Sequence, residues 1–446
     1  MQPTDLSIRD AGAALRAGRL TATDLAQAHL DLISRLNPSI GAFVAITPDL
    51  ALAAAARADA DFAAGIDRGP MQGIGFAVKD LIDLKGLPTT CGSRHHAADP
   101  AMVDATVIAG LLGVGAVPLG KVATYEYALV GPSLDSPQPP PVNPWNFAHI
   151  TGGSSSGAAA AVAAGMVRVA IGTDTGGSIR SPACYCGVVG LKPTFGTVSR
   201  DGVFPVSGDL DHVGPLAATV ADAALMADAM GIRGAATRLV QPVKGLRIGY
   251  ARAWFANDPA THPAVLTAMD AAVSDLTLLG MKIELIDLPN YTQMESVGAV
   301  ILHYQALAIH RCALLGGKYG RQAVQTLLAG LNISTADFQM ARALGQRMRA
   351  QTSAILSRYD AVVTANVLSP APPFSAFSDG RAVWTAMRTL PFNVTGHPVL
   401  ALPIGFTAGL PMGMQLIASH GHEATLCQIG HAFERSTDHA AQRPRV

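Results

Sequence analysis

The N-terminal part of the chain shows the pattern of amphipathic helices. Between Leu25 and Leu36, apolar residues recur three or four positions apart, which places them on one helix face. Thr21 stands where a hydroxyl can cap the first turn, and an acidic residue follows three positions later, as in a capping box. A short strand is expected at residues 41–47, before an alanine-rich helix. We therefore predict that residues 1–66 form an N-terminal helical segment.

Beyond residue 73 the pattern changes to short apolar runs separated by glycine-rich turns and amphipathic helices. Alternation of this kind is typical of layered α/β folds. We predict an α/β fold in which a mixed, twisted β-sheet is surrounded by α-helices. The expected strands are residues 74–78, 116–120, 167–171, 246–250, 282–288, 359–364, 399–404 and 412–418, and the main expected helices are residues 106–113, 263–279, 335–359 and 423–435.

No composition change or repeat divides the chain convincingly. The proline-rich run from Ser136 to Pro141 is interpreted as a loop inside the domain. We expect a single domain spanning residues 1–446. Within it, the helical stretch at residues 291–359 carries no motif, and it is expected to be a variable region that lines the substrate pocket.

Composition narrows the classes of function. Apolar residues make up 49% of the chain and charged residues 14%, which excludes a disordered protein. Lys+Arg and Asp+Glu number 32 each, so the basic excess of a typical nucleic-acid-binding protein is absent. We therefore expect no nucleic-acid partner.

The sequence also shows no signal for export or for a membrane. Its first residues lack the charged and apolar regions of a signal peptide. The most apolar stretch, residues 158–171, is shorter than the ~20 apolar residues of a membrane-spanning helix. The five cysteines show no disulfide spacing, so free thiols in a reducing compartment are expected. We expect a cytoplasmic protein that binds no membrane.

Three segments carry candidate chemistry. Lys79 follows the apolar strand at 74–78, Ser154 lies in a Gly-Gly-Ser-Ser-Ser-Gly turn, and Ser178 ends a Thr-Gly-Gly-Ser turn after another apolar strand. Glycines let backbone amides approach a substrate closely, and converging amides stabilise a developing oxyanion. A serine needs a base to remove its proton, and a desolvated lysine with a lowered pKa can serve as that base. The pattern favours a Ser/Lys acyl hydrolase.

Phosphate binding and metal binding are the competing interpretations. Neither glycine-rich loop has the lysine of a P-loop or the spacing of a dinucleotide-binding loop. The histidines at 95–96 and at 420 and 422 have no carboxylate or thiol at ligand spacing. We interpret these histidines as surface or loop residues and expect no metal site.

The three segments, with those around them, closely resemble the motifs of the amidase-signature family. The resemblance runs from about residue 73 to residue 215 and resumes at residues 391–415. The matching motifs are Val78-Lys79-Asp80, Asn143-Pro-Trp-Asn146, Gly152-Gly-Ser-Ser-Ser-Gly157, Gly172-Thr-Asp-Thr-Gly-Gly-Ser-Ile-Arg-Ser-Pro-Ala183, Cys186-Gly-Val-Val-Gly-Leu-Lys-Pro-Thr194 and Leu210-Asp-His-Val-Gly-Pro215. The family fold is a mixed sheet wrapped by helices, in agreement with the pattern above.

The resemblance implies a role for each residue of the site. Ser178 would be the nucleophile, Ser154 would be the proton relay after a cis peptide bond, and Lys79 would be the neutral base. The oxyanion hole would consist of the backbone amides of Thr175, Gly176, Gly177 and Ser178. Neither a metal nor an organic cofactor would be needed. Family members are often dimers, so a homodimer is expected.

The residues that flank the proposed triad have structural interpretations as well. Ser155 could replace Ser154 as the relay, but with Ser156 it is expected to cap the following helix. Asp174 and Arg180 are expected to form an ion pair that ties the nucleophile loop together.

Two further residues are candidates for the wall of the substrate pocket. These are Tyr125 and Cys184. The alternative for both is packing in the core, which is the usual role of a free cysteine.

The leading prediction is a stand-alone amidohydrolase that cleaves the C–N acyl bond of a small, neutral aryl or alkyl amide through a seryl acyl-enzyme. The same machinery would open carbamates (urethanes) and esters, because only the acyl substituent and the leaving group differ. The alternative is the glutaminase subunit of a tRNA-dependent amidotransferase, which would release ammonia for a partner subunit. The segment Pro391–Pro398 resembles free-standing amidases more closely. A non-catalytic scaffold is disfavoured because the whole triad set is present.

Overall fold

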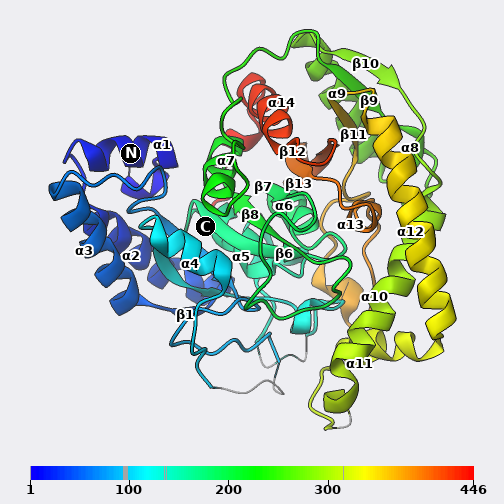
Figure 1. The fold of residues 1–446 in the computed structure, drawn as a ribbon, viewed down its shortest axis with the longest axis horizontal. Coiled ribbons are helices and arrows are strands. Elements are labelled where there is room, and N and C mark those ends of the chain that lie inside the picture. The colour runs from blue at the N-terminus through cyan, green and yellow to red at the C-terminus, as the bar shows by residue number, and fades with distance from the viewer. Residues whose placement is uncertain (1, 94–98, 135, 137, 315) are drawn as a thin grey trace.

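A computed structural model describes residues 2–93, 99–134, 136, 138–314 and 316–446. Its centre is a mixed sheet of eleven strands, and helices surround this sheet (Figure 1). The predicted α/β class is therefore confirmed. In order across the sheet, the strands are β1 (Phe43–Ile46), β3 (Val117–Val122), β2 (Gly75–Lys79), β6 (Val169–Asp174), β8 (His212–Ala217), β7 (Val189–Lys192), β12 (Val399–Thr407), β13 (Leu410–Ile417), β11 (Ala361–Ala365), β9 (Arg247–Tyr250) and β10 (Lys282–Leu285).

Strand direction determines where the ends of the central strands lie. β2 runs parallel to both of its neighbours, β3 and β6. The carboxyl ends of these three strands therefore lie at the same edge of the sheet. Val78 is paired with Ile171, so Lys79 comes close to the residues that follow Ile171.

The three strands of this central group are buried along their whole length. A strand that is covered on both faces has a nearly continuous apolar run, which is why the sequence predicts these strands well. β7 and β8 are not among the predicted strands. Gly190, Gly214 and Pro215 interrupt their apolar pattern, although all of their residues are buried.

The N-terminal segment has the predicted helices and short strand. It contains α1 (Ile8–Arg16), α2 (Ala22–Ile40), β1 and α3 (Pro48–Ala63). The Thr21 side chain accepts a hydrogen bond from the Asp24 amide and caps α2 as predicted. The reciprocal bond of a capping box is not formed, and the next two amides, those of Ala22 and Thr23, donate to Asp59 of α3.

The other helices lie between strands or beyond them. The longer ones are α4 (Thr106–Gly113), α5 (Ser156–Ala163), α6 (Arg180–Cys186), α7 (Val220–Ala229), α9 (Pro263–Leu278), α10 (Tyr291–Leu314), α11 (Arg321–Leu328), α12 (Thr335–Leu356) and α14 (Glu423–Ser436). Short elements are α8 (Ala253–Ala256), α13 (Pro391–Val394), the hairpin of β4 (Val142–Asn143) and β5 (Asn146–Ile150), and the 3-10 turns Pro3–Asp5, Glu126–Ala128, Ala329–Asn332, Phe374–Phe377 and His439–Ala441.

Helix α5 is buried on all sides, which explains its run of glycine and alanine. A Cβ atom on Gly157 would lie 2.3 Å from the Ala123 amide nitrogen and 2.4 Å from the Ala42 carbonyl oxygen. Glycine therefore lets the first turn of α5 approach the end of β3. This close approach places the serines before α5 beside the central strands.

Helices α10, α11 and α12 lie at one end of the molecule, far from the N-terminal helices (Figure 1). Helix α10 packs against α11, α12 and α13. Among the described residues, α10 is the one helix whose length and apolar content would suit a membrane span. A core helix has the same composition, and Met294, Val297 and Ile301 of α10 belong to a buried cluster.

Candidate active site

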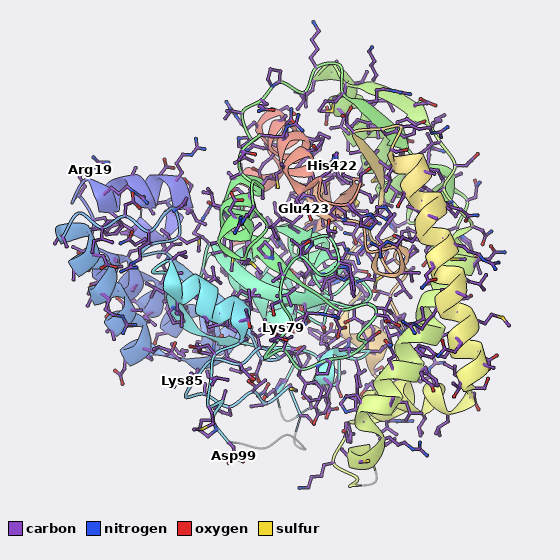
Figure 2. All side chains as sticks on the ribbon, in the orientation of Figure 1. Arg19, Lys79, Lys85, Asp99, His422 and Glu423 are labelled. Atoms are coloured by element: carbon purple, nitrogen blue, oxygen red, sulfur yellow. The ribbon has the colours of Figure 1, made fainter. Side chains whose placement is uncertain are left out.

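The three candidate segments meet at one edge of the sheet. Lys79 is the last residue of β2, Ser178 follows the end of β6, and Ser154 precedes α5. Figure 2 places Lys79 near the middle of the molecule, whereas Arg19 and Asp99 lie at its rim. The structure thus brings together residues that are far apart in the sequence and that the motifs had singled out.

The amine of Lys79 is fully buried and contacts three hydroxyl groups. Its Nζ lies 2.8 Å from the Oγ of Ser154, 3.0 Å from the Oγ of Ser155 and 2.8 Å from the Oγ1 of Thr173. Burial lowers the pKa of Lys79 to about 7, although the negative charges of Asp174 and Asp211 act in the opposite direction. A large fraction of the amine is therefore neutral at physiological pH and able to accept a proton.

The two serines beside Lys79 differ in what their hydroxyl protons do. Ser155 donates to the Thr173 carbonyl oxygen at 3.1 Å and accepts from the Thr173 amide at 3.3 Å. Its proton is thus engaged, and the hydroxyl can only accept from Lys79. Ser154 lines the same pocket as Ser178, so of the two hydroxyls it is the one that lies between Lys79 and Ser178.

The expectation that Ser155 and Ser156 cap α5 is wrong. Ser155 occupies the cap position, but its side chain makes no capping hydrogen bond. Ser156 donates to the Ala123 carbonyl oxygen at 3.3 Å. Both hydroxyls are used in contacts with β6 and with the chain after β3, because α5 lies directly against these strands.

The backbone around Ser154 is held from two sides. The peptide bond between Gly153 and Ser154 is cis, as the resemblance implies. The Tyr125 amide donates to the Ser154 carbonyl oxygen at 3.2 Å, and the Ser155 amide donates to the Ser178 carbonyl oxygen at 3.2 Å. The second bond links the segment that carries Ser154 directly to Ser178.

A buried ion pair organises the nucleophile loop, as predicted. Arg180 donates to both carboxylate oxygens of Asp174, at 2.8 and 2.9 Å, and neither side chain is exposed. Burial alone would raise the pKa of Asp174. The charge and hydrogen bonds of Arg180 and a hydrogen bond from Asn393 outweigh burial and hold this pKa far below its usual range.

The same carboxylate corrects one part of the predicted oxyanion hole. The Gly177 amide donates to Asp174 at 2.9 Å and is therefore already engaged. No hydrogen bond within the described part of the chain uses the amides of Thr175, Gly176 or Ser178. These three amides are the ones free to stabilise an oxyanion. Sequence spacing could not separate them from Gly177, because the difference comes from the orientation of the Asp174 side chain.

The segment from residue 384 to residue 390 closes over the nucleophile loop. Thr389 donates a hydrogen bond through its hydroxyl to the Gly176 carbonyl oxygen. Gly177 has a φ of +136°, and a Cβ there would lie 2.3 Å from the Oγ1 of Thr389. Two terminal ring carbons of Trp384 would lie 3.3 Å from a Cβ on Gly176. Glycine is thus needed in this loop for its backbone angles and for close packing.

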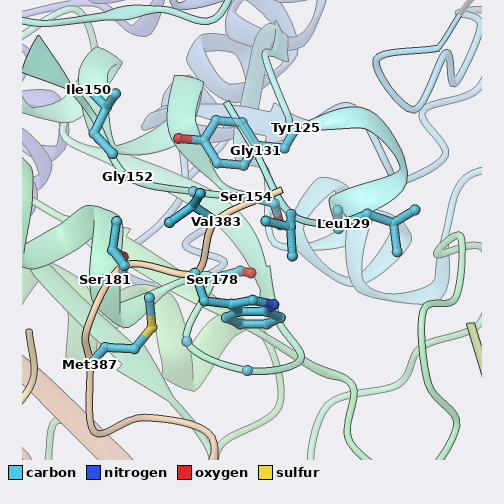
Figure 3. Close-up of a pocket in the computed structure, with 17 residues that line it drawn as sticks. Tyr125, Leu129, Gly131, Ile150, Gly152, Ser154, Ser178, Ser181, Val383 and Met387 are labelled. Atoms are coloured by element: carbon cyan, nitrogen blue, oxygen red, sulfur yellow. The ribbon is translucent and has the colours of Figure 1, made fainter. Parts of the chain in front are cut away.

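Ser154 and Ser178 line the same pocket (Figure 3). Ser178 is half-buried there. None of the described residues that line this pocket has a charged side chain. The lining residues are Tyr125, Ala128, Leu129, Val130, Gly131, Ile150, Gly152, Gly153, Ser154, Gly176, Gly177, Ser178, Ser181, Val383, Trp384, Thr385 and Met387.

The two predicted wall residues have different positions. Tyr125 lines the pocket, and its ring packs so closely on Gly153 that a Cβ there would lie 2.2 Å away. Cys184 is fully buried in α6 and is not a lining residue. Its Sγ packs against Gly413 of β13. The expectation that Cys184 belongs to the wall is therefore corrected in favour of core packing.

Residues 291–359 were expected to line the substrate pocket. This expectation is wrong, because none of the described lining residues comes from this region. Residues 383–387 form that side of the pocket instead. Helix α10 supports them from outside, since the Tyr291 hydroxyl donates to the Met387 carbonyl oxygen at 2.8 Å. No motif marks residues 383–387 in the sequence.

No histidine or cysteine among the described residues lines this pocket. His420 contacts the Thr395 carbonyl oxygen through Nε2 at 3.0 Å, and His95 and His96 fall outside the described residues. Within the described ranges, no group of three or more His, Cys, Asp or Glu side chains is arranged to hold a metal ion. All five cysteines are free thiols, as predicted.

Known proteins resemble this chain over nearly its whole length. The family model described as Amidase matches residues 24–427. A glutamyl-tRNA(Gln) amidotransferase subunit of Chloroflexus aurantiacus is 36% identical over 485 positions, which cover 99% of this chain and 98% of the relative. The peptide amidase of Stenotrophomonas maltophilia has a TM-score of 0.84 at 29% identity and covers 99% of this chain and 98% of its own. A third similar structure is a chain from a vestigial protein complex that reveals the origins of an s-triazine catabolic enzyme. Its TM-score is 0.90 at 30% identity, and the match covers 99% of this chain and 100% of that one.

Proposed function

Because the chain belongs to the amidase family, it is a hydrolase that acts on C–N bonds, and we propose that its substrates are small neutral amides, with carbamates as a second class. One observation carries this proposal. The described lining of the pocket has no charged side chain. A charged substrate group would lose its hydration there without gaining an ionic partner, which is costly. Neutral acyl and amine groups fit such a pocket.

The proposed reaction begins with attack by Ser178 on the carbonyl carbon. Its proton passes to Ser154 Oγ, and Ser154 passes its own proton to the neutral amine of Lys79. The resulting oxyanion accepts hydrogen bonds from the amides of Thr175, Gly176 and Ser178. These donors are part of the backbone, so they are in place before the charge develops.

The relay then runs in the opposite direction. Protonated Lys79 returns a proton through Ser154 to the nitrogen of the leaving group, because an amine departs easily only when it is protonated. The C–N bond breaks, and the acyl group stays on Ser178 as an ester. Water attacks this ester with the same relay as base, and the carboxylic acid is released. A carbamate would release an amine in the first step and an unstable carbonic half-ester in the second.

The main alternative is the glutaminase subunit of a tRNA-dependent amidotransferase. The 36% identity to one subunit of such an enzyme, over 99% of this chain, favours it. Glutamine, however, carries an ammonium and a carboxylate group at neutral pH. The described pocket lining offers neither of them an ionic partner, which supports the neutral-amide proposal.

The test compares three substrates and three proteins. The three proteins are wild type, Ser178→Ala and Lys79→Met. For each protein we measure the release of p-nitroaniline from a neutral acyl anilide, of the amine from an N-aryl carbamate and of ammonia from glutamine. We expect turnover of the anilide by wild type only, and none of glutamine. Near wild-type rates for Lys79→Met across pH would contradict the relay. Cleavage of glutamine in preference to the neutral substrates would support the alternative function.

A further inference from the structure

Trp384 occupies an unusual position for a large apolar side chain. It is 45% exposed and nevertheless belongs to the lining of the catalytic pocket. Its ring packs against the Cα of Gly176, two residues before the nucleophile Ser178. An indole is thus placed at the surface and in the wall of the pocket that contains Ser178.

The segment that carries Trp384 is held on both sides. Before it, the Ala382 amide donates to the side chain of Gln325 in α11 at 2.8 Å. After it, the Ala386 carbonyl oxygen accepts from the Leu368 amide at 2.9 Å. Position 384 is therefore determined by contacts with two distant parts of the chain. A side chain held in this way can provide a preformed surface for a ligand.

The order in which the two products leave indicates which part of the substrate lies against Trp384. In a double-displacement reaction the amine leaves first, while the acyl group remains bound to Ser178. The amine must therefore occupy the part of the pocket that opens to solvent. Trp384 and its neighbour Val383 are 45% and 39% exposed, whereas the lining residues Tyr125, Leu129 and Ile150 are no more than 8% exposed, so Trp384 lies on the open side.

We propose that Trp384 is a specificity-determining residue that stacks against an aromatic amine in the leaving-group position. This inference rests on the proposed function and narrows it to anilides and N-aryl carbamates. The flat indole offers an aromatic amine a stacking surface that an alkylamine cannot use equally well. The exposed position leaves room for rings of different sizes.

The experiment compares an anilide and an N-alkylamide of the same carboxylic acid, so that the acyl group is constant. We expect Trp384→Leu to lower kcat/KM for the anilide roughly tenfold relative to the alkylamide, as expected for loss of an aromatic contact. Trp384→Phe keeps an aromatic face and should recover most of this preference. The partition of the acyl-enzyme between water and added hydroxylamine should be the same in all variants, because the acyl-enzyme no longer contains the aryl group.

The control variant is Phe147→Leu, because Phe147 is also 45% exposed but is not a lining residue. This substitution should leave kcat/KM for both substrates unchanged. If Trp384→Leu lowered kcat/KM equally for the anilide and the alkylamide, or lowered it for neither, the inference would be overturned and the proposed function would remain intact. A wild type that cleaves neither amide would overturn the proposed function itself, and this inference with it.

Discussion

The hydroxyl of Ser155 lies 3.0 Å from the Nζ of Lys79, close enough for a hydrogen bond but without a free proton to pass on. Its proton is donated to the Thr173 carbonyl oxygen. Ser154 lies at nearly the same distance from the amine, but on the side of the substrate pocket. Equal proximity to the base therefore does not imply equal function.

This difference predicts unequal effects of two matched substitutions. Ser154→Ala should lower kcat by about 100- to 10,000-fold, the usual contribution of general acid–base catalysis. Ser155→Ala should lower kcat by no more than about tenfold, because a single neutral hydrogen bond contributes ~1 kcal/mol. Steady-state kinetics on one anilide, with thermal unfolding as a control for folding, makes the comparison. Equal losses in the two variants would contradict the assignment of Ser154.

The pKa of Lys79 predicts the pH dependence of the reaction. The base must be neutral, and protonation removes it, so kcat/KM for a neutral amide should rise with pH and level off above about pH 7. The negative charge of Asp211 favours the protonated amine. Asp211→Asn should therefore move the rise in activity to lower pH. A pH–rate profile of both proteins tests this, and activity that is constant between pH 5 and pH 9 would exclude Lys79 as the base.

Gly177 is expected to tolerate no side chain. Alanine would place a methyl group 2.3 Å from the Oγ1 of Thr389 and would have to adopt a φ of +136°. Gly177→Ala should lower kcat/KM by more than ~100-fold through displaced oxyanion donors. It should also cost about 1–3 kcal/mol of stability through overpacking.

The matched control for this substitution is Gly208→Ala, because a Cβ at Gly208 meets no atom within 4 Å. Its stability should stay within ~0.5 kcal/mol of wild type. Chemical denaturation and anilide turnover measure both quantities. Wild-type activity in Gly177→Ala would show that the loop is not held as closely as described.

The Asp174–Arg180 pair predicts a cost in stability that depends on both partners. Arg180→Met leaves a buried carboxylate without its counterion and should cost about 3–5 kcal/mol. Adding Asp174→Asn removes that charge and should recover part of the loss. Urea unfolding of the two single variants and the double variant at pH 7 gives the coupling between the residues. If the double variant lost as much stability as the two single variants together, the two residues would not be coupled.

The meeting of Lys79, Ser154 and Ser178 was predictable because motif and burial agree at their positions. Lys79 ends an apolar strand, and Ser178 follows another, so parallel pairing of β2 and β6 brings their ends together. The resemblance favours Ser154 over Ser155 as the relay, and the hydrogen bond that Ser155 donates to the Thr173 carbonyl oxygen is a physical reason for the same choice. Local pattern and strand direction are sufficient for this part of the site.

The rest of the site depends on contacts between distant parts of the chain. The Gly177 amide is engaged because of the orientation of Asp174, and that orientation depends partly on Asn393. Cys184 packs inside because Gly413 leaves room for its sulfur atom. Trp384 reaches the pocket because α10 and α11 hold the segments around it. Neither residue spacing nor hydrophobic periodicity encodes such contacts.

The distance in sequence between the nucleophile loop and its supports has a consequence for protein synthesis. Arg180 donates to the Thr389 carbonyl oxygen, 209 residues later, and Asn393 donates to Asp174 across 219 residues. A ribosome therefore completes Lys79, Ser154 and Ser178 long before the residues that hold the loop emerge. The growing chain should have no hydrolase activity until Thr389 and Asn393 have been synthesised and hold this loop, so activity should appear long after the reactive side chains themselves.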